Sequence, residues 1–316
     1  MSTTHTLRNR GPASQEQSLK HNLQEEISLV KKTILRLYHW NEIPDWQKDN
    51  SYILTGYVRE TLDYLACLKS LTYIHNETIN IYSHLIPGLL LIVSNFFLVN
   101  WNLFLPTFTT TVFLDKAIVL LFLMGLSSCL ALSSCFHCFK CHSLEISAFI
   151  NKLDYLGINI LITTSMLSLI YFALIDYPHL ISVFWSITLV LGAICSISSL
   201  HSSFSSVKWR PYRATMFVLF GLSGLFPVVS SFVKIGYAET WNRAQLNYIF
   251  LEAFLYIFGA FLYAARIPER FWPGKFDLYG HSHQLFHFLV VLAACAHGKG
   301  LIESYKYAHQ YVLLAH

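Results

Sequence analysis

Long stretches without charged residues most strongly constrain how this chain can fold. Six such runs lack Asp, Glu, Lys and Arg, and they cover 78–114, 117–139, 155–175, 177–207, 214–233 and 278–298. A seventh run, 244–265, carries a single charge at Glu252. A helix of about 20 apolar residues crosses the hydrocarbon core of a bilayer. Because only 13% of the residues are charged, against about 25% in a typical soluble domain, the runs predict a membrane protein.

The runs predict an all-α integral membrane protein whose fold is a bundle of seven transmembrane helices. The first run holds one span and a loop, because Pro106 and the threonines at 109–111 follow its apolar part. We expect spans near 79–99, 117–137, 154–174, 180–201, 214–234, 246–265 and 284–304. The chain therefore divides into an N-terminal region, 1–77, and a membrane domain, 78–316.

Basic residues predict which way the bundle faces. The loops after the second, fourth and sixth spans carry eight Lys and Arg residues, and the loops after the first, third and fifth carry three. The N-terminal region carries nine. Cytoplasmic loops are enriched in Lys and Arg, so we expect a cytosolic N-terminus. An odd number of spans then places the C-terminus outside the cell or in the lumen.

The cytosolic N-terminal region contains one amphipathic pattern, near 23–38. Its apolar residues recur at steps of three and four, as on one face of a helix. They are Leu23, Ile27, Val30, Ile34 and Leu37. Two interpretations remain open: the helix packs on the bundle, or it binds a partner or the membrane surface.

Polar residues gather at one end of the predicted bundle. Successive spans run in opposite directions, so the starts of odd spans and the ends of even spans share the cytosolic side. The polar residues at these ends are Glu77, Asn80, His84, Ser133, His137, Asp154, His201, His283 and His287. Reversing the topology would move them together, so their convergence does not depend on the orientation. Ionisable groups in a membrane are costly unless satisfied, and they commonly mark functional sites.

The histidines in this group have the spacing of a metal site. His283 and His287 lie four residues apart, so both face one side of a helix and can reach one ion. His137 is the candidate third ligand, which leaves the fourth tetrahedral position of a zinc ion open, as in catalytic sites. Ser133 lies one turn earlier and can orient the ligands, while Asp154 can hold or deprotonate a zinc-bound water.

Simpler interpretations stand beside this one. Membrane histidines are commonly hydrogen-bonded to a neighbouring helix, without a metal. Glu77, Asn80 and His84 either anchor the first span to the cytosolic loops or bind a substrate headgroup. The stretch "CFHCFKCH", 135–142, offers a weaker alternative metal site through Cys135, Cys138 and His142.

Three further ionisable residues fall outside the expected cluster. His297 and His309 are expected in or near loops. Glu252 is expected near mid-membrane, where it is either hydrogen-bonded inside the bundle or part of a cavity.

Several motifs together resemble adiponectin receptors, within the progestin and adipoQ receptor family, which is related to haemolysin III-type proteins. The resemblance is carried by "AARIPERFWPGKFDLYGHSHQLFH" (264–287), "IPDWQKDNSYILTGY" (43–57), "HNETINIYSH" (75–84), and "SSCFHCFKCHS" followed by "KLDYLGI". It extends from about residue 40 to 300. The amphipathic stretch in a compact N-terminus suggests the fungal branch, which is implicated in zinc and lipid or sterol homeostasis.

The resemblance implies Zn²⁺ held by His137, His283 and His287 near the cytosolic leaflet, with Asp154 contacting it through water. It also implies a slow amidase activity that cleaves ceramide. The sequence departs from the pattern at His281, which stands where adiponectin receptors have glutamine and can perturb the site or bind metal itself.

Two hypotheses for function follow. In the first, the protein is a signalling receptor that also hydrolyses a lipid amide such as ceramide with zinc. Asp154 helps to deliver the water, and Ser133 orients or stabilises the tetrahedral oxygen. In the second, it is a non-enzymatic receptor or regulator whose structural zinc joins the second and seventh spans. A zinc transporter is a weaker reading, because no chain of ligands crosses the membrane. We expect a ceramide-like or sphingolipid-like partner, no nucleic acid, and residence in the endoplasmic reticulum membrane in preference to the plasma membrane; the extracellular ligand is not predicted.

Overall fold

The computed structural model describes residues 36–97, 105–201 and 207–314, together with His21, Gln24 and Phe204. The described residues form helices and no strand, with one isolated antiparallel bridge between Tyr38 and Tyr57. The expected all-α class is therefore confirmed. The amphipathic helix expected near 23–38 lies outside the described residues, apart from Gln24 and 36–38.

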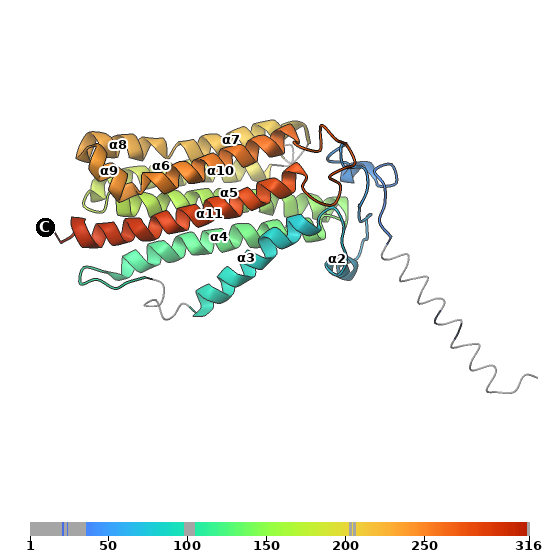
Figure 1. The fold of residues 1–316 in the computed structure, drawn as a ribbon, viewed down its shortest axis with the longest axis horizontal. Helices are drawn as coiled ribbons and strands as arrows, with labels where there is room; N and C mark the ends of the chain where they lie inside the picture. Colours follow the sequence, from blue (N-terminus) through green and yellow to red (C-terminus); the bar gives the residue numbers. More distant parts are fainter. Residues whose placement is uncertain are drawn as a thin grey trace, which may run out of the picture.

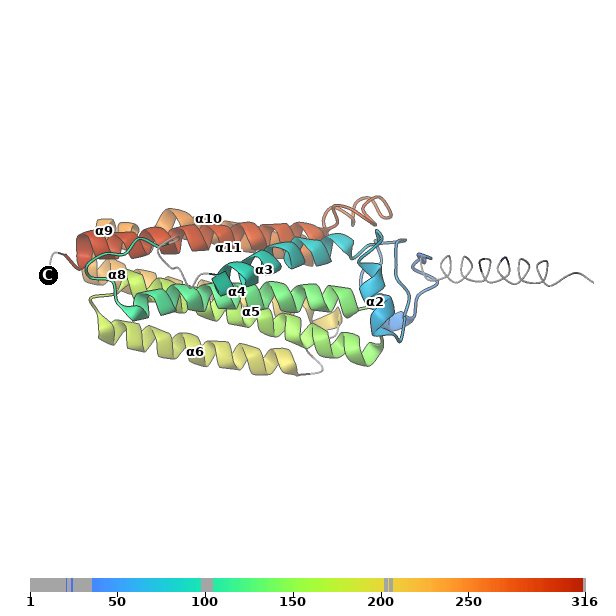
Figure 2. The same ribbon diagram turned by 90° about the horizontal axis from the view of Figure 1, so that it is seen from below.

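Long helices lie side by side and form an elongated bundle (Figures 1 and 2). They are α3 (Thr78–Phe97), α4 (Phe113–Phe139), α5 (Leu144–Ala173), α6 (Pro178–Leu200), α7 (Arg210–Leu222), α8 (Leu225–Ile235), α10 (Leu246–Ala265) and α11 (Ser282–Tyr307). The short elements are the 3-10 turns η1 (Asp45–Gln47) and η4 (Val207–Trp209), the helices α2 (Tyr64–Ser70) and α9 (Tyr237–Ala244), and a π-helical turn, η5 (Ala308–Val312).

Within the described residues, six helices are long and apolar enough to cross a membrane. They are α4, α5, α6, the pair α7 and α8 counted as Pro211–Ile235, α10, and α11 extended to Val312. The helix α3 contributes a shorter apolar segment, Thr78–Ser94. A membrane-spanning helical bundle fits this set.

The structure corrects two of the expected helices. The span expected near 214–234 is divided, because α7 ends at Leu222 and α8 begins at Leu225. Pro227 explains the break, since proline lacks an N–H group and its ring clashes with the carbonyl four residues earlier. The helix α5 begins at Leu144, ten residues before the expected start, and the Ser143 hydroxyl accepts a hydrogen bond from the Ile146 N–H to cap it.

Close packing of α4 and α5 forms the centre of the bundle. A Cβ added at Gly125 would lie 2.0 Å from the Thr164 hydroxyl, and one at Gly157 would lie 3.1 Å from the Cys129 Cα. Small residues let membrane helices approach closely in this way. The helix α11 contacts α3, α4, α5 and α10. Residues near the ends of α4 and α11 are thereby brought together.

The described part of the N-terminal region holds the loop that leads into α11, at the end of the bundle opposite the C-terminus (Figure 1). Asp277 accepts hydrogen bonds from the Leu54 N–H (2.9 Å) and the Thr55 hydroxyl (2.7 Å). Glu269 accepts one from the Asn50 amide (3.0 Å) and one from the Ser282 N–H (2.8 Å). These bonds fix the position at which α11 begins.

Candidate metal centre

Three histidines from two helices meet around one point. His137 lies near the end of α4, and His283 and His287 lie in the first two turns of α11. Their ligating nitrogens all lie within 4.8 Å of one another. The ring centroids of the three pairs are 4.8, 4.8 and 4.9 Å apart. His137 and His287 are buried and His283 is half-buried, so we call these residues the inner triad.

Oxygen atoms around the inner triad fix the protonation of two rings. The Nδ1 of His137 lies 2.8 Å from a Glu77 carboxylate oxygen, and the Nδ1 of His287 lies 3.0 Å from the Asn80 carbonyl. A carboxylate or carbonyl oxygen only accepts, so each Nδ1 carries the proton and donates. Each Nε2 is then left with a lone pair, the state that a metal ligand needs.

The Nε2 of His137 provides a test of whether a metal fits. It is buried, and the described residues offer it no hydrogen-bond partner. Leaving a buried polar atom unsatisfied costs about 1–3 kcal/mol, a cost that a bound cation would remove. Three imidazoles form a donor set suited to zinc, copper, iron or nickel. The residues present therefore fit a metal ion, and the inner triad could bind one.

Glu77 links the inner triad to the surface of the protein. Besides His137, its carboxylate accepts hydrogen bonds from the Asn80 amide at 2.6 Å and the Lys140 ammonium at 2.7 Å. Burial alone would raise the pKa of the Glu77 carboxyl, but Lys140 and His137 hold that pKa well below its usual range. Glu77 is consequently an anion that only accepts, which is why His137 donates from Nδ1.

His84, Ser133 and Asp154 surround the inner triad without joining it. The His84 ring stacks on His287 with centroids 3.8 Å apart, and its Nδ1 lies 2.9 Å from the Ser133 hydroxyl. Asp154 is buried, and its carboxyl lies close enough to His137 and Ser133 to interact with them electrostatically. It lies about three turns into α5, not at the start of the helix as expected, because α5 begins at Leu144.

The structure keeps other sequence candidates away from this point. The Nε2 of His281 lies 3.2 Å from the Asn76 carbonyl, and His201 is exposed at the end of α6. Cys135 is exposed, while Cys138 is buried against the Cys67 carbonyl. The inner triad is the sole group of three metal-ligating side chains that converge in the described ranges, so the alternative site in 135–142 does not form.

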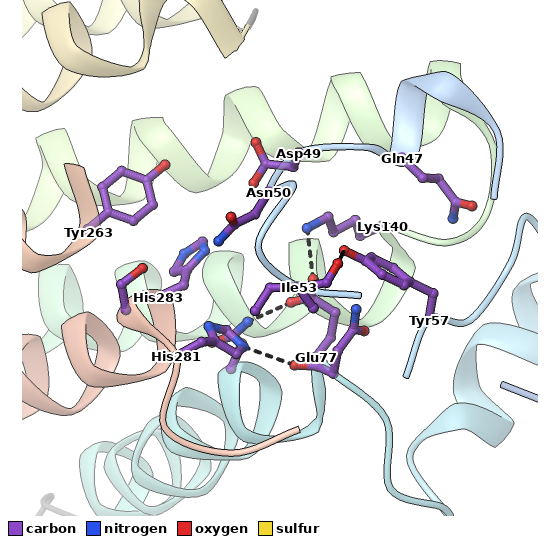
Figure 3. A pocket seen from close by; sticks show the side chains of 13 residues that line it. Gln47, Asp49, Asn50, Ile53, Tyr57, Glu77, Lys140, Tyr263, His281 and His283 are labelled. Carbon is purple, nitrogen blue, oxygen red and sulfur yellow. Dashed lines mark hydrogen bonds and ion pairs between the residues drawn. The ribbon is translucent and has the colours of Figure 1, made fainter. Parts of the chain in front are cut away.

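His283 connects the inner triad to an open pocket (Figure 3). The pocket measures about 440 Å³ including the space at its mouth. Asp49 and Asn50 contribute to its wall from the N-terminal region, and Lys140 and Tyr263 contribute from the ends of α4 and α10. The lining carries many polar and charged groups, and His283 is the triad member that a solute in this pocket would meet.

Reasoning from the sequence missed some partners and misplaced others. Lys140 was used above only to predict the orientation of the bundle. It follows His137 by three residues, about one helical turn, and this spacing indicates that it lies beside the site. His297 and His309 were expected in or near loops, but they are buried side chains of α11 and η5. Glu252 is hydrogen-bonded inside the bundle, 2.9 Å from the Nδ1 of His297.

Comparisons with known proteins find relatives that match most of the chain. Residues 72–298 match the family described as haemolysin-III related. The chain is 50% identical over 286 residues to the ADIPOR-like receptor IZH2 of Saccharomyces cerevisiae, covering 90% of this chain and 89% of that one. It is 44% identical over 306 residues to the ADIPOR-like receptor IZH1 of Eremothecium gossypii, covering 96% and 95%. It is 34% identical over 299 residues to the adiponectin receptor protein of Drosophila melanogaster, covering 93% and 66%.

Proposed function

The chain belongs to the haemolysin-III-related family, in the fungal branch of the progestin and adipoQ receptors, and we propose that it is a receptor-like protein with an intramembrane zinc site. It is an integral, multi-pass membrane protein. Its role under this proposal is in lipid or sterol and zinc homeostasis, with the endoplasmic reticulum membrane as its residence.

The proposed topology has seven spans, with α3 as the first and the N-terminus in the cytosol. The apolar segment Thr78–Ser94 and the contacts of α3 with α4 and α11 support a seventh span. The basic N-terminal region supports the orientation, because Lys and Arg favour the cytosolic side. The inner triad then lies near the cytosolic leaflet, and the C-terminus lies outside or in the lumen.

One observation carries the zinc assignment: the buried Nε2 of His137, which has no hydrogen-bond partner among the described residues, lies in a group of three converging imidazoles. His137, His283 and His287 would hold the ion. When bound, zinc supplies a Lewis acid that polarises a carbonyl and lowers the pKa of water. The contact between Glu77 and His137 keeps the ligand ring in the tautomer that binding requires.

The residues beside the inner triad suit hydrolysis of a lipid amide such as ceramide. Asp154 is the buried carboxylate that would take the proton of an attacking water. Ser133, whose hydroxyl lies 2.9 Å from the His84 Nδ1, would orient or stabilise the tetrahedral oxygen. The half-buried face of His283 would admit the amide. Asp154 would then return its proton to the departing amine.

A second candidate is a non-enzymatic receptor in which zinc is structural. The polar lining of the pocket beside His283 favours it, because an acyl chain would be expected to enter an apolar cavity. In this case zinc joins α4 to α11, and a ligand acts by shifting these helices.

Replacing Asp154 by Asn separates the two candidates. Under the first, the variant keeps one zinc per chain and loses ceramide hydrolysis by about 10²–10⁴-fold, the usual contribution of a general base. Zinc is measured by mass spectrometry of the purified protein, and hydrolysis by fatty acid released from labelled ceramide in mixed micelles. Asp115→Asn is the matched control, a buried aspartate at the other end of α4.

The remaining outcomes decide between the candidates. Wild-type protein that carries zinc and releases no fatty acid favours the structural role. Hydrolysis that persists in a zinc-free His137→Ala variant contradicts the zinc-dependent mechanism.

A further inference from the structure

Two cysteines far apart in the sequence touch beside the proposed cytosolic end of the bundle. Cys67 lies in α2 and Cys141 lies two residues after α4, with 3.5 Å between their sulfurs. Cys67 is 0% exposed and Cys141 is 7% exposed. Neither belongs to the inner triad or to the amidase proposal.

Backbone hydrogen bonds hold these two cysteines in place. The Thr61 N–H donates to the Cys141 carbonyl at 2.9 Å, and the Leu62 N–H donates to the His142 carbonyl at 2.9 Å. The segment that precedes α2 is therefore paired with the segment that follows α4. A disulfide has a sulfur–sulfur distance of about 2.05 Å, so bond formation needs a closing movement of about 1.5 Å. Rotation about the side-chain bonds can supply a movement of this size.

The two thiols are chemically unequal. The Cys67 sulfur accepts a hydrogen bond from the Cys141 thiol, and the Thr61 hydroxyl lies 3.2 Å from it. The hydrogen bond from Cys141 lowers the pKa of Cys67 to about 7, and the same bond raises the pKa of Cys141. Since the thiolate is the reactive form, Cys67 is the nucleophile of the pair and Cys141 is placed to resolve its oxidised product.

The other cysteines lack this arrangement. Cys138 is the nearest, but its sulfur contacts the Cys67 carbonyl at 3.8 Å and no other sulfur. Cys129 and Cys195 are buried in the apolar core, and Cys135 and Cys295 are exposed. All seven cysteines lie in the described ranges, and Cys67 and Cys141 are the one pair in contact.

We propose that Cys67 and Cys141 are a redox modification site, at which a hydroperoxide forms a reversible disulfide between α2 and the end of α4. The Cys67 thiolate attacks the peroxide oxygen and breaks the O–O bond, giving a sulfenic acid and an alcohol, or water from hydrogen peroxide. The Cys141 thiol then attacks the Cys67 sulfur and releases water. Two electrons pass from the thiols to the peroxide, and both thiol protons end in the products. A dithiol reductant reverses the reaction, so the bond is transient in a reducing compartment.

The bond would act on the residues that orient the inner triad. Lys140 precedes Cys141, and its ammonium holds Glu77 at 2.7 Å. A disulfide at Cys141 would therefore tie the residue next to that ion pair to α2. Formation of the disulfide does not itself depend on whether the inner triad binds zinc.

Peptide mapping of the full chain tests the proposal. Purified protein in detergent is treated with hydrogen peroxide, free thiols are blocked with N-ethylmaleimide, and a non-reducing digest is analysed by mass spectrometry. We expect the peptide with Cys67 linked to the peptide with Cys141, and the loss of two of the seven thiols of each chain. Dithiothreitol should restore both thiols.

Substitutions identify the partners. Cys67→Ser and Cys141→Ser should each abolish the linked peptide, while the matched control Cys138→Ser should retain it. Wild-type protein is informative even if a variant does not fold. Unchanged thiols in peroxide-treated wild type, or a link that joins Cys67 to Cys138 instead, would overturn the proposal.

Discussion

Two groups of polar side chains, each with a buried histidine, lie at opposite ends of α4 and α11. The inner triad joins the end of α4 to the start of α11. The second cluster, which we call the outer cluster, consists of Asp115 at the start of α4, His309 in η5 after α11, and Thr110 in the preceding loop. Asp115 is 1% exposed and His309 is 0% exposed, so these two side chains are enclosed by protein, as are His137 and His287 of the inner triad.

Their partners differ. The His309 Nδ1 lies 2.7 Å from the Thr110 hydroxyl, and its Nε2 lies 3.2 Å from an Asp115 carboxylate oxygen, an ion-pair distance without the geometry of a hydrogen bond. Asp115 also accepts a hydrogen bond from the Tyr171 hydroxyl at 2.9 Å, so the outer cluster ties α4, α5 and η5 together. In the inner triad the Nε2 of His137 has no oxygen partner among the described residues. Each group thus holds a buried histidine, and the difference lies beside its second nitrogen: a carboxylate oxygen at His309, and two further imidazoles at His137.

Removing one histidine from each group should have different effects on zinc affinity. His287→Ala should lower zinc affinity by more than about 100-fold, because it removes a direct ligand and even the loss of a ligand's partner costs 10- to 100-fold. His309→Ala should leave zinc affinity unchanged and lower the melting temperature. Zinc affinity is measured by competition with a chelator of known affinity, and unfolding by a thermal scan.

Equal zinc loss in the two variants would contradict the distinction between the two groups. Zinc lost equally from His287→Ala and His309→Ala would mean that metal is retained only through the general stability of the bundle.

A substitution at Glu77, the carboxylate beside His137, should have a smaller effect on zinc affinity. Glu77→Gln should weaken zinc binding by about 10- to 100-fold, because the neutral amide orients His137 and its Nδ1 proton less strongly. The matched control is Glu252→Gln, which alters another carboxylate–histidine pair, at His297, without touching the inner triad. Equilibrium dialysis against buffered zinc measures both. Equal affinities in the two variants would show that Glu77 has no part in holding a metal.

Much of the membrane domain could be predicted because its signals are local. The helix expected near 246–265 is α10 with the same bounds, since an apolar run needs no distant partner to form a helix in a membrane. The spacing of His283 and His287 is equally local, because residues four apart share a helix face. The alternating direction of the spans predicted that His137 lies at the same end of the bundle as His283 and His287.

The rest depends on features that an apolar run does not encode. The start of α5 was predicted ten residues too late. A charge-free run marks only the part of a helix that lies in the hydrocarbon core, whereas α5 begins outside it, at Leu144 after the Ser143 cap. The contact of Cys67 with Cys141 and that of Asp115 with His309 join residues 74 and 194 positions apart, and no periodicity links them. Pro227 was visible in the sequence and did mark the break between α7 and α8.

The smallest expected effect concerns Thr110, whose hydroxyl lies 2.7 Å from the Nδ1 of His309. Thr110→Val should lower the free energy of unfolding by about 1 kcal/mol, the usual net worth of one hydrogen bond, and leave zinc affinity unchanged. Thr163→Val is the matched control, since its hydroxyl donates to the Asn159 carbonyl within its own helix, and such a bond adds little to stability. Unfolding is followed with and without a zinc chelator. If chelation removed the difference between Thr110→Val and wild type, the outer cluster would be coupled to the metal, and its histidine could not be called merely structural.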